Sequence, residues 1–269
     1  PSYGRVSRYG LIAYASSLDQ IGPFARSARD LARLYDVIAG HDAHDSTSSQ
    51  ESVHSLEITL QKAPQDLKGL RIGIVREFMG EGLDSEVRQA FDEALKVYQS
   101  LGAELVDVSL PHVKHSIPVY YILATAEASS NLARFDGIRY GYRTQKTGIN
   151  LRDMYALNRS EGFGHEVKQR IMLGTYVLSA GYYDAYYGKA GRIRELIRRE
   201  FKDCFSRYVD VIATPTAPST AFEIGQKTED SLAMYLSDIY TIAANLAGIP
   251  ALSHPIGVDS QGLPIGLQL

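Results

Sequence analysis

The sequence predicts an α/β protein, and three observations point to that fold class. Residues 70–75 and residues 105–108 form two short apolar runs. Between them, Asp84 is placed to cap an amphipathic helix that ends near Gly102. A third run, apolar except for Asp210, covers residues 209–213. Strand, helix and strand in this order are typical of a helix packed on a parallel pair of strands. The helix has its expected inward face at Val87, Phe91, Leu95 and Tyr98.

The composition is that of an ordinary globular protein, with 45% hydrophobic and 22% charged residues in 269. A net charge of −3 gives no electrostatic case for direct nucleic-acid binding, which usually needs a strongly basic surface. Cys204 is the single cysteine, so an intramolecular disulfide or a cysteine-based zinc site is excluded and a reducing compartment is expected. No run of about 18 apolar residues predicts a membrane helix, and the cytoplasm is the default location.

Ahead of the first strand, the pattern predicts a helix that Ser27 caps and Gly40 ends. Its apolar face should pack on the core, with Ala28, Leu31, Leu34, Tyr35 and Ile38 on it. A polar stretch at residues 40–49 follows, with two His and two Asp close together. A metal site is one interpretation of that stretch. A solvated loop whose side chains bond their own backbone is favoured, because Ser- and Asp-rich runs between helices usually behave so.

Helices are also expected in the middle of the chain. Residues 119–135 form one, and residues 161–190 form two that meet near Gly181. The tyrosines of this second region are expected to pack in the core or at an interface; they are Tyr176, Tyr182, Tyr183, Tyr186 and Tyr187. The basic helix at residues 192–202 contains Glu195 and Glu200, so a solvated face of mixed charge is favoured over an RNA site.

The third strand runs into residues 214–218, which include two prolines. Irregular backbone at a strand end is where α/β proteins place their sites, so this segment is expected to form an active-site wall. A helix over residues 232–246 and a hairpin around residues 259–262 complete the pattern. Because no repeat or long linker interrupts the chain, one domain is expected over residues 1–269.

The sequence lacks the common motifs of nucleotide, metal and serine-nucleophile chemistry. The chain has no Gly-x-Gly-x-x-Gly, no phosphate-binding loop and no His-Glu-x-x-His, so nucleotide and zinc-protease chemistry lose support. It also has no Gly-x-Ser-x-Gly nucleophile motif. A complete catalytic unit is therefore not visible in these residues.

Four segments resemble the amidase signature family, and within it the tRNA-dependent amidotransferase branch. They are YGRVSRYG at residues 3–10 with SSLDQIGP at 16–23, AEASSNLARFDG at 126–137, residues 162–187, and ANLAGIP at 244–250. The resemblance implies a mixed central sheet covered by helices on both faces. It also implies a Ser-cisSer-Lys triad that activates a serine nucleophile, and all three residues precede Pro1 in the family order. We therefore expect no catalytic residue in this chain. The chain starts at Pro1 without Met and ends in an apolar run over residues 263–269 that resembles a strand cut short, so truncation at both ends is expected.

The same resemblance implies a glutamine pocket, which needs a cation for the carboxylate and an anion for the ammonium group. Arg170 matches the family's carboxylate-binding residue, and arginine offers a two-pronged contact that lysine does not. Asp238 matches the residue that takes the ammonium group. Tyr121 would supply a hydroxyl and a wall, with Tyr120 as the alternative. The plain alternative for each is an exposed ion pair or a packed tyrosine.

The family further implies partners and cofactors. A glutamine-hydrolysing subunit releases ammonia, and a B subunit uses ATP and Mg²⁺ to convert Glu-tRNA(Gln) to Gln-tRNA(Gln), with a small C subunit joining the two. The tRNA would then be bound indirectly, and this chain would hold neither a metal nor a cofactor. Cytoplasm, or the matrix of an organelle, would be the location.

Two other functions remain open. A stand-alone amidase acting on apolar amides would need an apolar pocket and no paired Arg170 and Asp238, so the presence of both disfavours it. A noncatalytic binding module would need no nucleophile at all. An upstream sequence with a lysine and a Gly-Gly-Ser loop would separate these functions.

Overall fold

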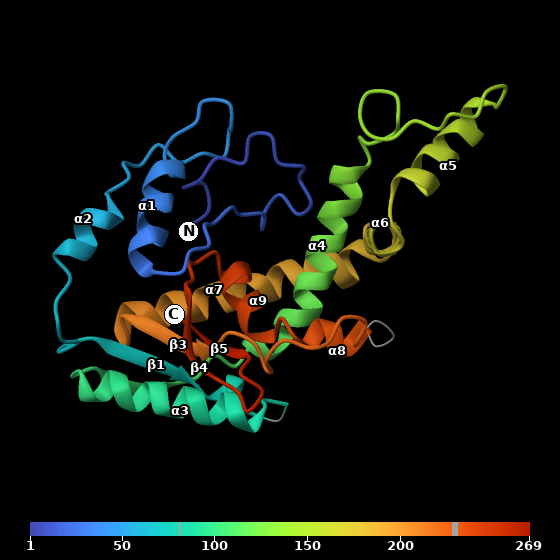
Figure 1. Ribbon diagram of the computed structural model, residues 1–269. Helices are drawn as coiled ribbons and strands as arrows, with labels where there is room; N and C mark the ends of the chain where they lie inside the picture. Colours follow the sequence, from blue (N-terminus) through green and yellow to red (C-terminus); the bar gives the residue numbers. More distant parts are fainter. Residues whose placement is uncertain (81, 228–230) are drawn as a thin grey trace. The chain divides into compact units, whose positions relative to one another are not determined.

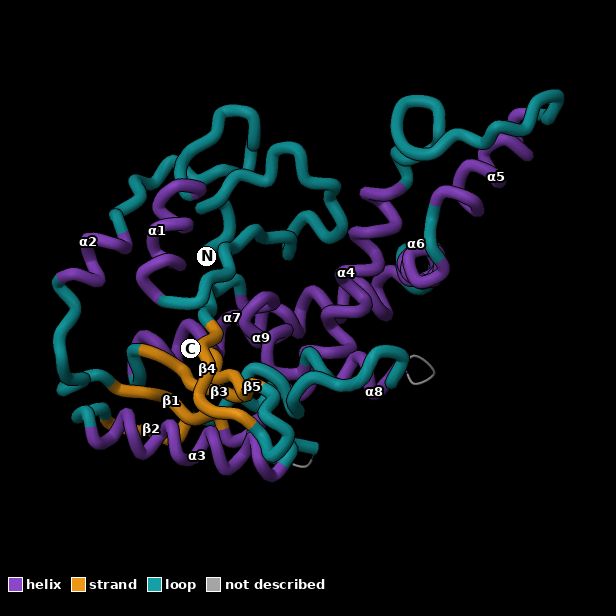
Figure 2. Tube along the Cα trace, viewed as in Figure 1, coloured by secondary structure: helices purple, strands orange, loops and turns teal. Residues whose placement is uncertain are grey.

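The structure is a computed structural model that describes residues 1–80, 82–227 and 231–269. Figure 1 and Figure 2 show helices and strands joined by long loops. The α-helices are α1 (Ala28–Ile38), α2 (Leu56–Gln61), α3 (Ser85–Ser100), α4 (Ser116–Leu132), α5 (Leu151–Gly162), α6 (His165–Val177), α7 (Lys189–Arg207), α8 (Ser231–Leu236) and α9 (Ile239–Ala247). The strands are β1 (Arg71–Val75), β2 (Glu104–Val108), β3 (Val211–Pro215), β4 (Ser253–Val258) and β5 (Pro264–Gln268). Shorter turns are the 3-10 helices η1 (Arg76–Phe78) and η2 (Val113–His115) and the π-helix η3 (Tyr183–Gly188).

The described chain forms two compact units. The first unit comprises Pro1–Tyr9, Gln20–Ile117 and Arg194–Leu269. The second unit comprises Gly10–Asp19 and Pro118–Ile193. The border between them falls within α4 and within α7.

A mixed sheet forms the centre of the first unit, with the strand order β2-β1-β3-β5-β4. Strands β2, β1 and β3 are parallel, β5 is antiparallel to β3, and β4 and β5 form an antiparallel hairpin. The structure thus confirms the predicted α/β class, the parallel pair flanking α3 and the hairpin near the carboxyl end. The third strand lies at Val211–Pro215, two residues later than expected.

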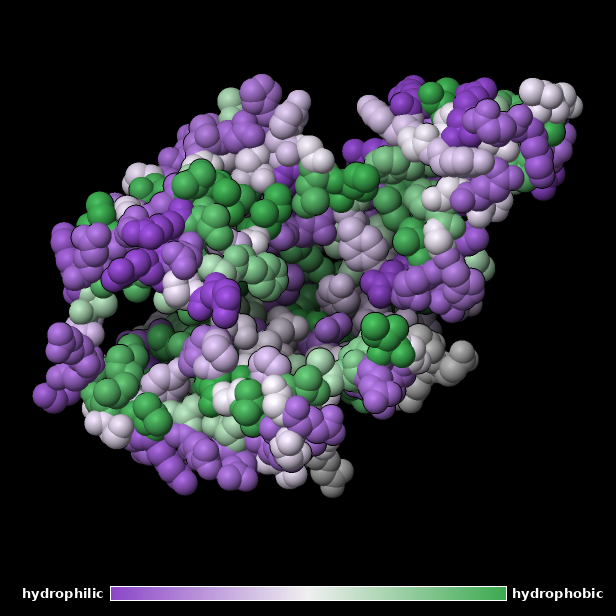
Figure 3. Space-filling view, viewed as in Figure 1, coloured by the Kyte–Doolittle hydropathy of each residue, from purple (hydrophilic) through white to green (hydrophobic). Residues whose placement is uncertain are grey.

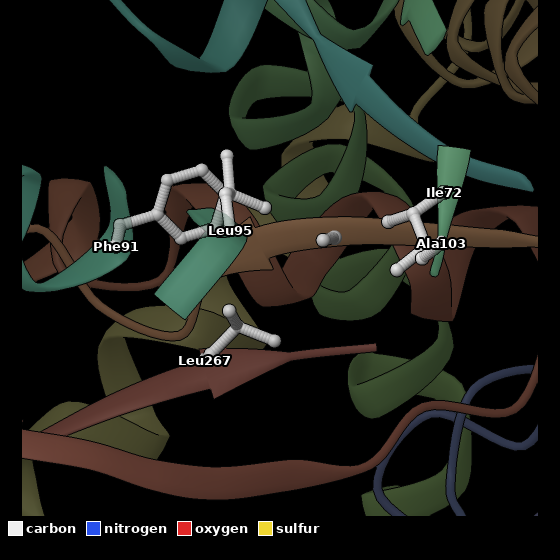
Figure 4. Close-up of a cluster of buried hydrophobic side chains, with 6 residues drawn as sticks. Ile72, Phe91, Leu95, Ala103 and Leu267 are labelled. Atoms are coloured by element: carbon white, nitrogen blue, oxygen red, sulfur yellow. The ribbon is translucent and has the colours of Figure 1, made fainter. Parts of the chain in front are cut away.

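Helix α3 covers one face of the sheet as the sequence predicts. Asp84 caps it by accepting hydrogen bonds from the backbone N–H groups of Glu86 and Val87. The side chains of Phe91 and Leu95 then enter the core cluster drawn in Figure 4. The outer side of α3, at the lower edge of Figure 3, is mostly hydrophilic. The cluster consists of Ile72, Phe91, Leu95, Ala103, Ala213 and Leu267.

The opposite face of the sheet is covered as well. Successive strand residues point to opposite faces, and Ala213 and Leu267 point toward α3. Their neighbours Thr214 and Gln268 therefore point the other way, where the Gln268 amide donates to the Tyr240 carbonyl of α9 at 3.1 Å and to the Thr214 hydroxyl at 3.0 Å. Figure 1 shows α7 and α9 on this side. Helices on both faces, as the family resemblance implies, are confirmed.

The core role predicted for α1 is wrong. Ser27 caps this helix as expected, with its hydroxyl accepting from the Asp30 N–H at 3.1 Å. Ala32 is buried, but Leu34 and Ile38 of the predicted inward face are exposed. A stripe of apolar residues at helical spacing predicts that a face can be buried, but not which segment covers it.

The polar stretch after α1 is a loop whose side chains bond its own backbone, as predicted. The carboxylate of Asp42 accepts from the His44 N–H at 2.9 Å, and that of Asp45 accepts from the Thr47 N–H at 2.9 Å. Both are bonds from an aspartate to the residue two positions later, which is the usual way that Asp stabilises a turn.

The tyrosine-rich region differs from its prediction in one respect. A break at Gly181, where φ is +86°, separates α6 from η3 and α7, as predicted. Tyr176, Tyr182 and Tyr186 pack against one another with ring centroids 4.5 to 6.3 Å apart, yet they are 40 to 48% exposed and do not lie in the core. Helix α5, just before this region, is an element that the sequence pattern did not predict.

The single helix expected over residues 232–246 is instead two helices, α8 and α9. The break falls at Ser237 and Asp238, and Asp238 occupies the N-cap position of α9. The Asp238 side chain makes no cap hydrogen bond to the backbone of α9, so side-chain capping does not account for the break. Gly248 ends α9 with φ of +73°, a left-handed conformation that glycine adopts without steric cost.

Candidate functional site

Arg170 and Tyr121, two of the predicted substrate-binding residues, lie together in the second unit. Arg170 is on α6 and Tyr121 is on α4, and the guanidinium carbon is 5.6 Å from the centroid of the tyrosine ring. A cation at this distance from an aromatic face is attracted by the electron-rich ring. The structure therefore brings a cation and a tyrosine wall together, as the sequence interpretation requires.

Close packing of α4 and α6 makes this contact possible. Gly174 is buried on α6 one turn after Arg170, and it lies against the backbone of Thr125, one turn after Tyr121 on α4. Because glycine has no side chain, the two backbones approach closely at this point. This close approach holds Arg170 and Tyr121, one turn earlier on their helices, side by side.

Two side chains hold the Arg170 guanidinium. Its Nε donates to Oε1 of Glu166 at 2.8 Å, and its Nη1 donates to the Tyr14 hydroxyl at 3.0 Å. The Tyr14 ring centroid is 5.7 Å from the guanidinium carbon. Among the residues that the structure describes, Nη2 has no hydrogen-bond partner. The side chain is 25% exposed, so an anion from solvent can reach it.

The Arg170 cation is permanent. Burial lowers the pKa of the guanidinium, but the hydrogen bonds to Tyr14 and Glu166 raise it by more, and the net effect is a pKa above the usual value for arginine. Glu166 is 54% exposed, so its charge is screened by water and neutralises the cation only in part. A partly buried cation with an unused donor is suited to a planar anion such as a carboxylate.

The irregular loop Gly10–Asp19 carries Tyr14 to this place. Both the backbone N–H and the hydroxyl of Ser17 donate to the Glu127 carboxylate, at 2.8 and 2.6 Å. The Asn131 amide donates to the Tyr14 carbonyl at 3.1 Å. Within the loop, the Asp19 carboxylate accepts from the backbone N–H of Tyr14 at 2.9 Å. Helix α4 therefore holds the loop by two of its side chains.

The two candidate tyrosines of α4 have different surroundings. Tyr121 faces the Arg170 guanidinium, whereas the ring of Tyr120 meets the edge of the Tyr121 ring with centroids 5.1 Å apart and an interplanar angle of 82°. This geometry favours Tyr121 as the partner of Arg170. That either one contacts a substrate stays a prediction.

Asp238, the third predicted residue, belongs to the first unit. It is exposed at the N-cap of α9, and its backbone carbonyl accepts from the N–H groups of Thr241 and Ile242 at 3.1 Å. An exposed carboxylate at a helix start can present its charge to a ligand, and its role toward an ammonium group stays a prediction.

The segment after β3, predicted as an active-site wall, lines a hollow of about 390 Å³ in the first unit. The Thr216 hydroxyl lies 2.8 Å from the Ser253 hydroxyl, and His254 Nε2 lies 2.6 Å from the Tyr98 hydroxyl. The predicted wall thus borders a real cavity, while a catalytic role for it remains a prediction. Its lining includes Thr216, Ala217, Ser253, His254, Ile265 and Gly266.

Sequence reasoning missed two contacts of Arg170. Tyr14 is 156 residues away in the chain, and nothing local in the sequence indicates that contact. Glu166 precedes Arg170 by four residues, and this spacing on a helix is a known signal for an ion pair. The contact of Arg170 with Glu166 could therefore have been predicted from the sequence, whereas its contact with Tyr14 could not.

In residues 1–80, 82–227 and 231–269, no group of three or more His, Cys, Asp and Glu side chains has the arrangement of a metal site. No helix in the same ranges combines the length and the apolar composition needed to cross a membrane.

Comparison with known proteins gives a consistent family match. A family model described as Amidase matches residues 1–269. The glutamyl-tRNA(Gln) amidotransferase A subunit from Caldanaerobacter subterraneus subsp. tengcongensis is 55% identical over 269 residues, which are 100% of this chain and 54% of that protein. The chain thus spans about half the length of the curated relatives it matches.

Solved structures show the same likeness. The crystal structure of the glutamyl-tRNA(Gln) amidotransferase A subunit from Thermotoga maritima has a TM-score of 0.76 and 41% identity, covering 100% of this chain and 52% of that one. A peptide amidase from Stenotrophomonas maltophilia has a TM-score of 0.70 and 26% identity, covering 100% of this chain and 53% of that one. At nearly equal coverage, the similarity is greater to the amidotransferase protein.

Proposed function

Because the chain belongs to the amidase family, we propose that it forms the glutamine-recognising part of the A subunit of glutamyl-tRNA(Gln) amidotransferase. In this proposal the whole protein hydrolyses the side-chain amide of glutamine. The ammonia released then converts Glu-tRNA(Gln) to Gln-tRNA(Gln). Whole-chain similarity at 55% identity to a protein of that name supports the proposal.

The state of Arg170 is the observation that carries the proposal. Free glutamine differs from simple amides by an α-carboxylate and an α-ammonium group, so a glutamine site needs a fixed cation. Arg170 is such a cation, since Tyr14, Tyr121 and Glu166 hold it and Nη2 remains available among the described residues. The α-carboxylate of glutamine would bind at that donor, and a second prong could come from the remaining N–H of Nη1.

The family resemblance supplies proposed roles for Tyr121 and Asp238, each considered within its own unit. The Tyr121 ring would form a wall beside the substrate carboxylate and its hydroxyl would orient the substrate. Asp238 would take the α-ammonium group, which an exposed carboxylate can do without a burial cost. We assign no nucleophile or general base among these residues. Their proposed role is to recognise the two charged groups of the substrate, and such recognition does not itself lower the barrier to hydrolysis.

We further propose that partner subunits complete the reaction. A B subunit would bind the misacylated tRNA and activate it with ATP and Mg²⁺, and a C subunit would join the two. The acidic balance of this chain, with a net charge of −3, agrees with RNA being bound by the partner. The single cysteine, Cys204, supports a reducing compartment, so the cytoplasm or an organellar matrix is the proposed location.

A stand-alone amidase for apolar amides is the alternative enzyme. Its pocket would gain nothing from a partly buried arginine, because an apolar substrate would cover the charged group without making a hydrogen bond to it. A noncatalytic binding module would be compatible with the residues named so far. The geometry at Arg170 favours a substrate with a free carboxylate over an apolar amide. A turnover assay separates the binding module from both enzymes.

The test uses the complete amidotransferase, in which the whole protein is bound to its partners. Ammonia release is measured with glutamine, asparagine and benzamide as substrates. We expect kcat/KM for glutamine to exceed that for benzamide by at least about 100-fold, because a site built for polar groups rejects ligands that leave those groups unpaired. Equal or better use of benzamide would favour a general amidase, and the absence of turnover with all three would favour a binding module.

A further inference from the structure

Tyr14 makes two kinds of contact with the same group. Its hydroxyl accepts a hydrogen bond from Arg170 Nη1 at 3.0 Å, and its ring faces the guanidinium at 5.7 Å. Tyr121 presents a second ring at 5.6 Å. The two rings and the hydroxyl restrict where the planar guanidinium can lie, so Tyr14 helps to set the direction of the unused Nη2.

The place of Tyr14 depends on α4. Glu127 and Asn131 are four residues apart on this helix and therefore share a face. Glu127 accepts both bonds from Ser17, and Asn131 donates to the Tyr14 carbonyl. The helix that carries Tyr121 thus also fixes the loop that carries Tyr14.

The Glu127 contact is a two-point clamp. One bond goes to the backbone N–H of Ser17 at 2.8 Å and the other to its hydroxyl at 2.6 Å. Hydrogen bonds to a charged carboxylate are shorter and stronger than those between neutral groups. Irregular loops depend on such side-chain bonds, since they lack the backbone ladder of a helix or strand.

We propose that Tyr14 is a positioning residue of the glutamine site, which orients Arg170 toward the substrate carboxylate and is itself held by the clamp between Glu127 and Ser17. This inference rests on the proposed function, because it assigns the carboxylate to Arg170. Tyr14 affects substrate binding by orienting Arg170. It takes no direct part in hydrolysis. The competing explanation is that Tyr14 only packs the loop onto α6.

The first experiment removes the hydroxyl alone. Tyr14→Phe is compared with Tyr142→Phe in the complete amidotransferase. The control also loses a tyrosine hydroxyl bonded within the second unit, since Tyr142 donates to Glu161 at 3.0 Å. We expect Tyr14→Phe to raise the KM for glutamine by about 2- to 10-fold, the usual net worth of one hydrogen bond, with kcat changed less than about twofold. The control should leave both constants within about twofold of wild type.

A double-mutant cycle then tests the route through Arg170. In an Arg170→Ala background, Tyr14→Phe should cause no further rise in KM, because its partner is gone. Glutamine is also compared with 4-aminobutanamide, which is glutamine without its α-carboxylate. Tyr14→Phe should reduce the preference for glutamine and leave the use of 4-aminobutanamide unchanged. A purely structural role predicts equal losses for both substrates and an additive double mutant.

The clamp is tested with two substitutions of one residue. Glu127→Ala should raise the KM for glutamine at least as much as Tyr14→Phe does. Glu127→Gln should restore most of it, because the amide oxygen accepts from the Ser17 N–H and the amide nitrogen donates to its hydroxyl. Glu161→Gln, a carboxylate that also bonds a hydroxyl in the second unit, serves as the control.

The results separate this inference from the proposed function. If Arg170→Ala raises the KM for glutamine and Tyr14→Phe does not, the positioning role is wrong and the function stands. If neither variant changes the use of glutamine, the assignment of the carboxylate to Arg170 is wrong. Additive losses in the double mutant, or a loss shared with 4-aminobutanamide, would overturn the proposal even if KM rises.

Discussion

Gly174 of α6 lies against the Thr125 carbonyl of α4 with no room for a methyl group between them. Thr125 is fully buried, and its hydroxyl bonds back to the Tyr121 carbonyl at 2.5 Å. The contact therefore fixes the spacing of two helices one turn away from Arg170 and Tyr121. The geometry of the candidate site depends on a residue that has no functional group.

We expect Gly174→Ala to destabilise the second unit and impair glutamine binding. Alanine ordinarily favours a helix over glycine by up to about 1 kcal/mol, but here its methyl group would force the backbones apart, and overpacking costs about 1 to 3 kcal/mol. Arg170 and Tyr121 should separate and the KM for glutamine should rise. Urea unfolding and steady-state kinetics measure the two effects.

Gly191→Ala is the matched control, since Gly191 lies within α7 and a methyl group there would meet no atom within 4 Å. It should be neutral or slightly stabilising. If Gly174→Ala behaved like this control, the close contact between α4 and α6 would not set the site.

Much of the sheet could be predicted because its signals are local. Asp84 and the apolar residues that follow it give a helix, and the flanking apolar runs give β1 and β2. A parallel pair then follows, because a strand, helix and strand in sequence return the chain in the same direction. The exposure of the apolar face of α1 could not be predicted. Helical periodicity shows that a helix has an apolar face, but it does not identify a segment that covers this face.

The residues of the candidate site also fall into those that the sequence could indicate and those that it could not. Arg170 and Tyr121 were found by resemblance to a family, and Glu166 could have been found from its spacing to Arg170. Tyr14 could not, because its contact spans 156 residues and depends on a loop held by Glu127. Contacts between distant segments need the tertiary structure, because the order of residues carries no local mark of them.

Asp210 should contribute stability that depends on pH. Its carboxylate accepts from the Arg71 side chain at 2.8 and 3.1 Å and from the Arg71 N–H at 2.9 Å, and these bonds lower its pKa from 3.8 to about 2. A depressed pKa means that the contribution is complete above the unfolded value and is lost as pH falls from 3.8 toward 2. Asp210→Asn should therefore lower the melting temperature at pH 7, with a difference that shrinks below pH of about 4.

Asp107→Asn is a suitable comparison for this measurement. Its carboxylate contacts a single donor of Arg76 at 3.3 Å, and both side chains are more than half exposed. Exposed pairs contribute little, so this variant should change the melting temperature less. A difference for Asp210→Asn that stays constant or grows on acidification would show that the Arg71 pair is not its cause.

Glu166→Gln should improve the use of glutamine. The Glu166 carboxylate bonds Arg170 Nε at 2.8 Å and competes electrostatically with an incoming carboxylate. The Glu166→Gln side chain keeps an oxygen that accepts from Arg170 Nε, and it removes the negative charge. An exposed pair is worth up to about 1 kcal/mol, so KM should fall by up to about fivefold. Glu195→Gln, which disturbs a pair in the first unit, should leave KM unchanged, and a severalfold rise for Glu166→Gln would contradict the competition.

Arg170→Ala should cripple glutamine-dependent amidation by the complete enzyme while sparing amidation that uses added ammonium salts. Arg170 is proposed to act only on glutamine, and removing one partner of a desolvated charge pair typically costs about 2 to 5 kcal/mol. At about 1.4 kcal/mol per factor of ten, this is a loss of roughly 30-fold to several thousand-fold in kcat/KM for glutamine. Ammonium bypasses the glutamine pocket, so transfer to the tRNA should continue near its normal rate. Lysine at this position should restore little, because it lacks the planar pair of donors.

Arg198→Ala provides the contrast, because Arg198 is 50% exposed and pairs with Glu195 on the surface of α7. Its loss should change either reaction by less than about 1 kcal/mol. The comparison of ammonia sources is decisive because a general loss of folding lowers both rates, whereas the loss of carboxylate binding lowers one. If Arg170→Ala kept glutamine-dependent turnover within a few-fold of wild type, or lost both ammonia sources equally, Arg170 would not be the carboxylate ligand.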